Sequence, residues 1–304
     1  MARAHARAAG RDGGRGVILD AQVHLWERDR PDRPYNGISE PNLSHPFGPE
    51  RMLPLMDEAG VDRVVIVPPG FMDPHNDYAL ECAERYPERF GVMGLLLPGA
   101  PGSAERVATW LRQPGMLGVR THVNARQRAR WASEELAESF WAACERHEVP
   151  VAVFAAGEAE YLEGVLMRHP GLRLVLDHLG LPQIDAGFRR EDLETMRRLA
   201  RRPGVVVKLS TLPARSTRGY PFPEVHAAAR AAYEYFGPER MMWATDHTQT
   251  LRRGRASYSE ELRLWSEALD FVTADELALI LGGTACDSLA WPAGVPSTAL
   301  AAAR

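Results

Sequence analysis

Three polar side chains are spaced two residues apart in the stretch Val17-Ile-Leu-Asp-Ala-Gln-Val-His-Leu-Trp26, near the start of the chain. The apolar residues of this stretch are typical of a buried strand. An extended strand would place Asp20, Gln22 and His24 on one face. Because buried polar groups need hydrogen-bond partners, we expect either a polar network that closes the end of a barrel or one part of an active site.

Two further polar side chains follow apolar runs later in the chain: His178 after residues 172–176, and Asp246 after residues 240–245. A carboxylate in an enclosed pocket can act as a general base towards water, because desolvation raises its pKa. The side chains of His24, His178 and Gln22 can donate hydrogen bonds to a carbonyl oxygen as it becomes an oxyanion. These four side chains predict hydrolysis of a carbonyl compound, with Asp246 as the base.

Basic side chains near the same positions indicate an acidic substrate, because arginine binds carboxylates through a bidentate fork. The candidate substrate-binding residues are Arg120, His122, Lys208, Arg215, Arg218, Trp26 and Tyr220. For Arg120 and Lys208 the alternative is a structural ion pair with Asp177 or Asp246. For Arg215 and Arg218 it is an exposed loop, and for the two aromatic residues it is packing.

These side chains need a scaffold, and the chain alternates between short apolar runs and amphipathic stretches. The runs with the length of strands are residues 17–23, 63–67, 90–97, 116–121, 150–154, 172–176, 204–209 and 240–245. Nearly all-apolar strands are typical of a sheet that is buried on both faces. Strand–helix units in this number predict an α/β protein, a single-domain (β/α)8 TIM barrel over residues 17–291. The alternative, a doubly wound sheet, would carry a glycine-rich first turn, whereas this chain has His24-Leu-Trp-Glu27 there.

A barrel of this kind has its active site at the carboxyl ends of the strands. The candidates that stand at predicted strand ends are His24, Arg120, His122, His178, Lys208 and Asp246. We therefore expect these side chains to line one pocket. The long loop that follows the first strand is expected to fold over the mouth of this pocket.

The composition predicts an ordinary globular protein that acts on a small molecule. The 304 residues carry a net charge of -4, which gives no indication of nucleic-acid binding. There is no apolar run of about 18 residues, so no membrane span is expected. Cys82, Cys144 and Cys286 are widely spaced, which favours free thiols in the core and a reducing, cytoplasmic compartment. The sequence leaves open whether the protein forms a homo-oligomer.

The two ends of the chain differ in composition from the rest. Residues 1–16 are rich in Arg, Ala and Gly and lack the apolar segment of a secretory signal. They predict a disordered N-terminal tail. Residues 292–304 are small and rich in alanine, and we expect a C-terminal tail there.

Motifs at four strand ends resemble those of the amidohydrolase superfamily. They are D-x-x-V-H-L-W from Asp20, L-D-H-L-G from Leu176, V-K-L-S from Val207 and T-D at Thr245. The chain is most similar to the amidohydrolase 2 branch, which includes sugar lactonases and 2-pyrone-4,6-dicarboxylate lactonase. The resemblance covers residues 18–290 and implies a barrel enzyme that hydrolyses lactones. It also implies that a metal can be dispensed with, as in the pyrone-dicarboxylate branch.

The chain departs from the metal-dependent members, which carry His-x-His after the first strand where this sequence has Gln22-Val-His24. The fifth run, residues 150–154, contributes no ligand either. His24, His178 and Asp246 remain, and a tight divalent site needs at least three well-placed protein ligands. We expect no cofactor and no required metal, and a weakly bound divalent metal such as zinc is the alternative.

The sequence thus predicts a metal-independent hydrolase of a lactone or a related carbonyl ester that bears a carboxylate. Three alternatives stay open. One is a metal-dependent hydrolase or decarboxylase with a reduced ligand set. Another is a lyase or cyclase of a biosynthetic pathway, and the last is a binding protein that has kept the barrel without the chemistry.

Overall fold

The computed structural model describes residues 16–182 and 193–291 of the chain. The strands in these residues are β1 (Leu19–Val23), β2 (Arg63–Ile66), β3 (Phe90–Leu95), β4 (Met116–His122), β5 (Val151–Phe154), β6 (Leu174–Leu176), β7 (Val205–Lys208) and β8 (Met241–Met242). Each one falls on a predicted apolar run. The predicted tails lie outside the described residues, apart from Gly16 at the edge of the first.

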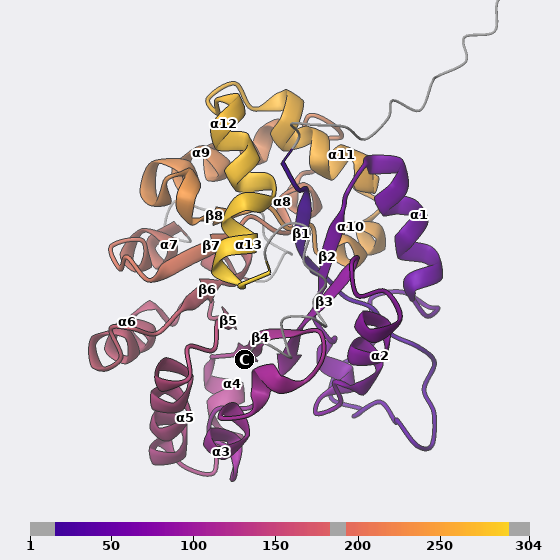
Figure 1. Cartoon of the computed structure of the whole chain (residues 1–304). Coiled ribbons are helices and arrows are strands. Elements are labelled where there is room, and N and C mark those ends of the chain that lie inside the picture. Colours follow the sequence, from indigo (N-terminus) through magenta and orange to yellow (C-terminus); the bar gives the residue numbers. More distant parts are fainter. Residues whose placement is uncertain (1–15, 183–192, 292–304) are drawn as a thin grey trace, which may run out of the picture.

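The strands form one parallel sheet in the order β1 to β8, so every strand pairs with its neighbour along the chain. The two edge strands meet where the N–H of Ala21 donates to the carbonyl of Trp243, at 3.0 Å. This contact closes the sheet into a barrel, and Figure 1 shows the helices arranged around its outside. The predicted (β/α)8 barrel is confirmed.

The α-helices are α1 (Pro49–Ala59), α2 (Asp77–Arg85), α3 (Ser103–Val107), α4 (Ala125–Arg128), α5 (Glu134–Arg146), α6 (Ala159–Arg168), α7 (Glu194–Leu199), α8 (Leu212–Arg215), α9 (His226–Phe236), α10 (His247–Arg253), α11 (Tyr258–Arg263), α12 (Ala274–Ala278) and α13 (Thr284–Ser288). None of the helices in the described part of the chain combines the length and the apolar character that crossing a lipid bilayer requires.

Several helix starts follow residues that favour the start of a helix. Pro49 opens α1, Ser133 caps α5, and Thr273 forms a capping box with Glu276 at the start of α12. Two residues of the cap type do not start a helix. Asp73 precedes Pro74, but the helix begins at Asp77, after a short 3₁₀ turn and a loop. The cap of α11 is Ser257 and not Ser259, because a glutamate stands three residues after Ser257 and completes a capping box.

The core has two layers that the sheet separates. The inner layer fills the barrel and contains Leu19, Val65, Met93 and other strand residues, with Trp291 and residues of α13 packed against it. The outer layer lies between the sheet and the surrounding helices and contains the larger share of the buried apolar side chains. Cys82, Cys144 and Cys286 are free and buried, in agreement with the prediction.

The prediction that Asp20, Gln22 and His24 share one face of the first strand is wrong for Asp20. Ala21 packs in the inner layer and Val23 in the outer layer, although they stand two residues apart. The cause is a shift in the pairing of β1 with β2 between Asp20 and Val23. Such a bulge adds one residue and reverses the alternation of side chains. Asp20 therefore faces the helices, whereas Gln22 and His24 face the barrel.

Candidate active site

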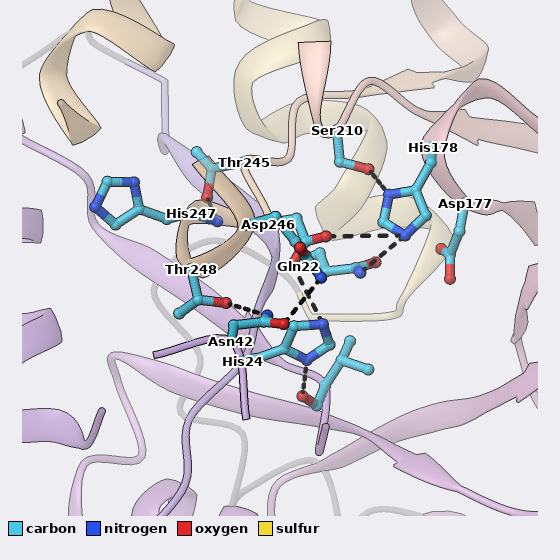
Figure 2. A network of polar contacts seen from close by, with 12 residues as sticks. Gln22, His24, Asn42, Asp177, His178, Ser210, Thr245, Asp246, His247 and Thr248 are labelled. Carbon is cyan, nitrogen blue, oxygen red and sulfur yellow. Dashed lines mark hydrogen bonds and ion pairs between the residues drawn. The ribbon is translucent and has the colours of Figure 1, made fainter. Parts of the chain in front are cut away.

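A cavity of about 650 Å³ opens at the carboxyl ends of the strands. The side chains at its inner end are His24 beyond β1, Arg120 and His122 of β4, Phe154 of β5, His178 beyond β6, and Thr211 and Asp246 beyond β7 and β8. Figure 2 shows His24, His178 and Asp246 turned toward one another. The structure brings these three residues together, as their positions at strand ends predicted.

Asp246 contacts both histidines and is buried. Its Oδ1 lies 3.2 Å from Nε2 of His24, and its Oδ2 lies 4.0 Å from Nε2 of His178. Burial raises the pKa of the Asp246 carboxyl well above its ordinary value, and Arg120 opposes this rise only in part. A carboxyl with a raised pKa is suited to accept a proton near neutral pH.

His178 and Asp246 have backbone conformations that residues other than glycine rarely adopt. His178 and Asp246 both have φ of 53°. A positive φ is uncommon for residues other than glycine, and such residues cluster at functional sites. In Asp246 the conformation is held by its N–H, which donates to the carbonyl of Gln22 at 2.8 Å. The turn after β8 is thus tied directly to β1.

The proton of the His24 ring can be placed from its partners. Nδ1 lies 2.7 Å from the carbonyl oxygen of Val67, which can only accept, so Nδ1 carries the hydrogen. Burial lowers the pKa of His24 to about 4, so the ring is neutral at pH 7 and Nε2 holds a lone pair. Nε2 of His24 and Oδ1 of Asp246 are then both acceptors, and a single proton between them would satisfy both.

His178 has the same tautomer by a similar argument. The amide oxygen of Gln22 accepts from the ammonium of Lys208 at 3.1 Å, so its nitrogen faces His178 Nε2 as the donor, at 3.5 Å. His178 Nδ1 then carries the hydrogen and donates to Ser210 Oγ at 2.6 Å (Figure 2). Burial lowers the pKa of His178 to about 3. Neutral His24 and His178 therefore have no hydrogen on Nε2, which contradicts their predicted role as donors to an oxyanion.

Lys208 is the single lysine of the sequence and is completely buried. Its ammonium lies 3.1 Å from Asp177 Oδ1, and Arg120 Nε lies 2.9 Å from Asp177 Oδ2. Burial alone would raise the pKa of Asp177, but the two cations outweigh it and bring that pKa well below the ordinary value. The structural ion pair with Asp177, which the sequence offered as the alternative for Arg120 and Lys208, is present.

A second buried polar network lies on the helix side of the turn that carries Asp246. Asp20 accepts hydrogen bonds from the backbone N–H and hydroxyl of Thr245, at 2.9 and 2.6 Å, and from the hydroxyl of Tyr258, at 3.0 Å. His247 pairs with Glu261 at 2.7 Å, and both side chains are buried. Because these contacts hold the residues on both sides of Asp246, they fix the position of its carboxylate.

Basic groups surround the cavity. Arg120 and Arg215 are buried and line it, and Arg120 donates to Nε2 of His122 at 2.8 Å. Four further arginines line the outer part, on the segments after β4 and β8: Arg126, Arg130, Arg252 and Arg253. The loop after β1 lines the mouth through residues 38–42, and Asn42 contacts Thr248 and Gln249 of α10. The loop thus folds over the mouth, as predicted.

Four of the predicted substrate-binding residues lie away from the cavity. Lys208 is sealed in the ion pair with Asp177. Trp26 packs between Phe47 and Phe71 in the outer core. The phenol of Tyr220 donates to Glu267, and Arg218 is 67% exposed and pairs with Glu224. Trp26, Tyr220 and Arg218 were predicted to bind substrate because they stand close in sequence to strand ends. Closeness in sequence does not reveal the direction of a side chain.

Several residues of the site were given no role by the sequence. Ser210 belongs to the V-K-L-S motif, and it orients His178 from a buried position behind the cavity. Phe154 packs against the rings of His122 and His178. Thr211 and the outer arginines lie in segments beyond the strand ends, among them the short helices α4 and α10, and the path of these segments has no pattern in a single sequence. The mouth of the cavity therefore carries basic residues that were not predicted.

Comparison with known proteins identifies the family. A family model described as amidohydrolase matches residues 19–288. The chain belongs to the amidohydrolase family. This confirms the family that the strand-end motifs indicated.

Three individual proteins of this group can be compared. An L-fucono-1,5-lactonase of Burkholderia ambifaria is 27% identical over 274 residues, which cover 88% of this chain and 93% of the relative. A 4-sulfomuconolactone hydrolase of Rhizobium radiobacter is 28% identical over 204 residues, 65% of this chain and 64% of the relative. A solved amidohydrolase of Burkholderia multivorans with bound zinc is 27% identical, with a TM-score of 0.74 over 91% of this chain and 100% of that one.

Proposed function

We propose that this amidohydrolase hydrolyses a lactone or a related carbonyl ester that carries a carboxylate. The observation that carries the proposal is the meeting of one carboxylate and two imidazole lone pairs, from Asp246, His24 and His178, at the bottom of a basic cavity. The two relatives named as lactone hydrolases support the substrate class. The arginines of the cavity support a negatively charged substrate.

The acceptors at the bottom of the cavity suit a water molecule as their ligand. A water can donate to Asp246 and to one Nε2, and it then directs an oxygen lone pair toward the substrate carbonyl. The water oxygen bonds to the carbonyl carbon while its proton passes to Asp246. The contact of 3.2 Å between Asp246 Oδ1 and His24 Nε2 then holds that proton between two acceptors.

The remaining steps use the same proton. The carbonyl oxygen becomes an oxyanion, and the donors available for it are the N–H groups of Arg120 and the amide of Gln22. When the bond between the carbonyl carbon and the ring oxygen breaks, the proton held by Asp246 and His24 passes to the departing alkoxide. The product is a hydroxy acid, and the site returns to its unprotonated form.

We further propose that no metal is required. Among residues 16–182 and 193–291, no three or more His, Cys, Asp or Glu side chains are arranged to hold a metal ion. Gln22 presents its amide N–H to His178, because Lys208 occupies its oxygen. A donor hydrogen thus stands where a further ligand would be needed, and the cations Arg120 and Lys208 lie nearby. These groups do not fit a tightly held dication.

A metal-dependent hydrolase is the second candidate. It is favoured by the Nε2 lone pairs of His24 and His178, which face the Asp246 carboxylate, and by the absence of a hydrogen-bond partner for Asp246 Oδ1 among the described residues. The similar amidohydrolase that was solved with zinc also favours it. Its ligand set would be reduced to three residues.

One assay tests both parts of the proposal. The purified protein is incubated with a panel of sugar lactones and carboxylate-bearing lactones, before and after dialysis against a strong chelator, and product masses are recorded. We expect products heavier by one water, at a rate that the chelator leaves unchanged. Activity lost on dialysis and restored by zinc or manganese would establish the second candidate.

Other masses would overturn the proposed reaction. Loss of carbon dioxide would indicate a decarboxylase, and a product with the mass of its substrate would indicate an isomerising lyase or cyclase. If no compound of the panel turned over but some bound, the protein would be a binding protein. Each of these results contradicts lactone hydrolysis.

The pH dependence follows from the pKa of Asp246. The charged and titratable groups around it are His24, His178, Arg120, Asp177, Asp20 and Glu261. Because burial raises the pKa of Asp246, the carboxyl holds a proton at pH values where an exposed aspartate, with a pKa of about 4, has lost it. A protonated base cannot accept a proton from water. We therefore expect kcat/KM to fall about tenfold per pH unit on the acidic side, from a midpoint well above pH 4.

A variant of His24 separates this explanation from a general loss of stability at low pH. In His24→Asn the protonated Asp246 loses the acceptor Nε2, so its pKa should fall and the acidic limb should move to lower pH. The half-buried His226 lies outside the residues that line the cavity and provides a control, since His226→Asn leaves the limb in place. A limb that stays at the same pH in His24→Asn would contradict the shared proton.

A further inference from the structure

Thr211 has a backbone conformation that its side chain opposes. Its φ is 65° and its ψ is 9°, in the left-handed region. For a β-branched residue this is a genuine outlier, whereas glycine adopts it at no steric cost. Strained residues of this kind persist where the surrounding structure holds them, and they are concentrated at functional sites. Threonine at this position therefore carries a cost in conformational free energy that glycine would avoid.

Thr211 lines the cavity next to residues that hold the site in place. The residue follows Ser210, the partner of His178, and its N–H donates to the carbonyl of Thr245 at 3.3 Å, one residue before Asp246. It is 2% exposed and lines the cavity. The backbone of Thr211 is thus anchored to the turn that carries the catalytic carboxylate.

The hydroxyl of Thr211 is buried without a hydrogen-bond partner among the described residues. A buried hydroxyl that makes no hydrogen bond is unfavourable, so such groups are rare unless a ligand completes them. Arg215 stands four residues further on, at the end of α8, and its side chain is also buried and lines the cavity. Both residues line the same cavity, and a hydroxyl and a guanidinium form a set of donors that suits a carboxylate. Arg215 also donates from Nη2 to the carbonyl of Pro182, at 2.6 Å.

We propose that Thr211 is a substrate-binding residue whose hydroxyl donates a hydrogen bond to a carboxylate oxygen of the substrate, beside Arg215. This inference rests on the proposed function in one respect, the carboxylate of the substrate. It assigns a role to a residue that takes no part in the proton transfers of Asp246 and His24. The loss of the hydroxyl should therefore act on KM and leave kcat nearly as it was.

Three variants separate the hydroxyl from the strain. Thr211→Val keeps the shape and removes the hydroxyl, and we expect KM for the best lactone to rise about tenfold, as for the loss of one charge-assisted hydrogen bond. Thr211→Gly relieves the strain and removes the hydroxyl, so its melting temperature should rise while its KM resembles that of the valine variant. Thr211→Ser restores the hydroxyl and should recover most of the lost affinity.

A matched control comes from the opposite end of the barrel. Thr284 is a buried threonine whose hydroxyl donates to the carbonyl of Pro238, at 3.1 Å. Thr284→Val removes a buried hydroxyl of the same kind and should leave KM unchanged. If Thr211→Val and Thr284→Val had the same KM, the hydroxyl of Thr211 would have no part in binding.

Calorimetric binding of citrate gives a readout that does not depend on lactone hydrolysis. Citrate offers carboxylates to Arg215 and Thr211, and we expect wild-type protein and Thr211→Ser to bind it about tenfold more tightly than Thr211→Val. Equal dissociation constants for the wild type and Thr211→Val, or no citrate binding by the wild type, would overturn the inference. If citrate binding behaves as expected but no lactone is hydrolysed, the proposed function fails and the assignment of Thr211 stands.

Discussion

Replacing Asp246 by asparagine is expected to lower kcat by roughly 10²–10⁴-fold, the range that one general base contributes. Asparagine keeps the size of the side chain and can keep the contact with His24, which lies 3.2 Å from Oδ1. It cannot take a proton from water. The measurement is steady-state hydrolysis of the best lactone of the panel, together with a circular dichroism spectrum. Full activity in a folded Asp246→Asn protein would refute the assignment of the base.

The same substitution is expected to stabilise the protein at alkaline pH. Burial raises the pKa of Asp246 in the folded state. A carboxyl of this kind contributes stability that is fully present below its unfolded pKa, about 4, and is lost as pH rises through the folded value. Asparagine does not ionise and avoids that loss. The melting temperature of Asp246→Asn should therefore exceed that of the wild type at pH 8, by a margin that shrinks toward pH 4.

An exposed aspartate provides the control for both measurements. Asp270 pairs with Arg230 at 3.3 Å, and its side chain is 93% exposed. Asp270→Asn should change neither kcat nor the pH dependence of the melting temperature. If Asp246→Asn were less stable than the wild type at pH 8, the carboxylate would be required for the fold, and its loss of activity would no longer identify a base.

The barrel could be predicted because its strands are buried on both faces and read as short apolar runs. The residues at their carboxyl ends could be predicted for the same reason, since every parallel strand of a barrel ends at the same rim. His24, His178 and Asp246 meet there although they are far apart in the sequence. The ion pair of Asp177 with Arg120 and Lys208 was one of two alternatives that the residue types allowed.

The remaining features depend on backbone geometry that residue types do not determine. The bulge in β1 turns Asp20 away from Gln22, because one extra residue reverses the alternation of a strand. The amide of Gln22 is oriented by Lys208, which lies 186 residues away in the sequence. The tautomer of His24 follows from the partner of its Nδ1, and that of His178 from the amide that faces its Nε2. In these tautomers both Nε2 atoms are acceptors, whereas the residue types alone had suggested donors.

Replacing Lys208 by methionine is expected to lower the free energy of unfolding by about 3–5 kcal/mol, the range observed when one partner of a buried ion pair is removed. Methionine fills most of the space of the lysine stem. In the wild type the ammonium lies 3.1 Å from Asp177 Oδ1. The variant leaves this oxygen without a cation, while Arg120 still holds Oδ2. The measurement is urea unfolding at pH 7, where Asp177 is ionised because its pKa lies well below the ordinary value.

Two further variants test whether the loss of stability comes from the uncompensated charge of Asp177. Arg230→Met removes a cation from an exposed pair, in which Arg230 is 51% exposed, and should cost less than about 1 kcal/mol. In the double variant Asp177→Asn with Lys208→Met, the charge of Asp177 is removed as well. The double variant should be more stable than Lys208→Met alone, because no uncompensated carboxylate remains in the core.

Lys208→Met should also impair catalysis, and this effect has a separate physical origin. Lys208 holds the oxygen of Gln22, so that the amide N–H is directed at His178. Without the ammonium the amide of Gln22 is no longer held in one orientation, so its N–H is lost as a fixed donor for the oxyanion. Loss of one such donor lowers kcat by about 10²–10³-fold. If Asp177→Asn with Lys208→Met regained stability and full kcat, the orientation of Gln22 would not depend on Lys208. Recovery of stability without recovery of kcat is the expected result, because the double variant restores the charge balance but not the group that holds the amide.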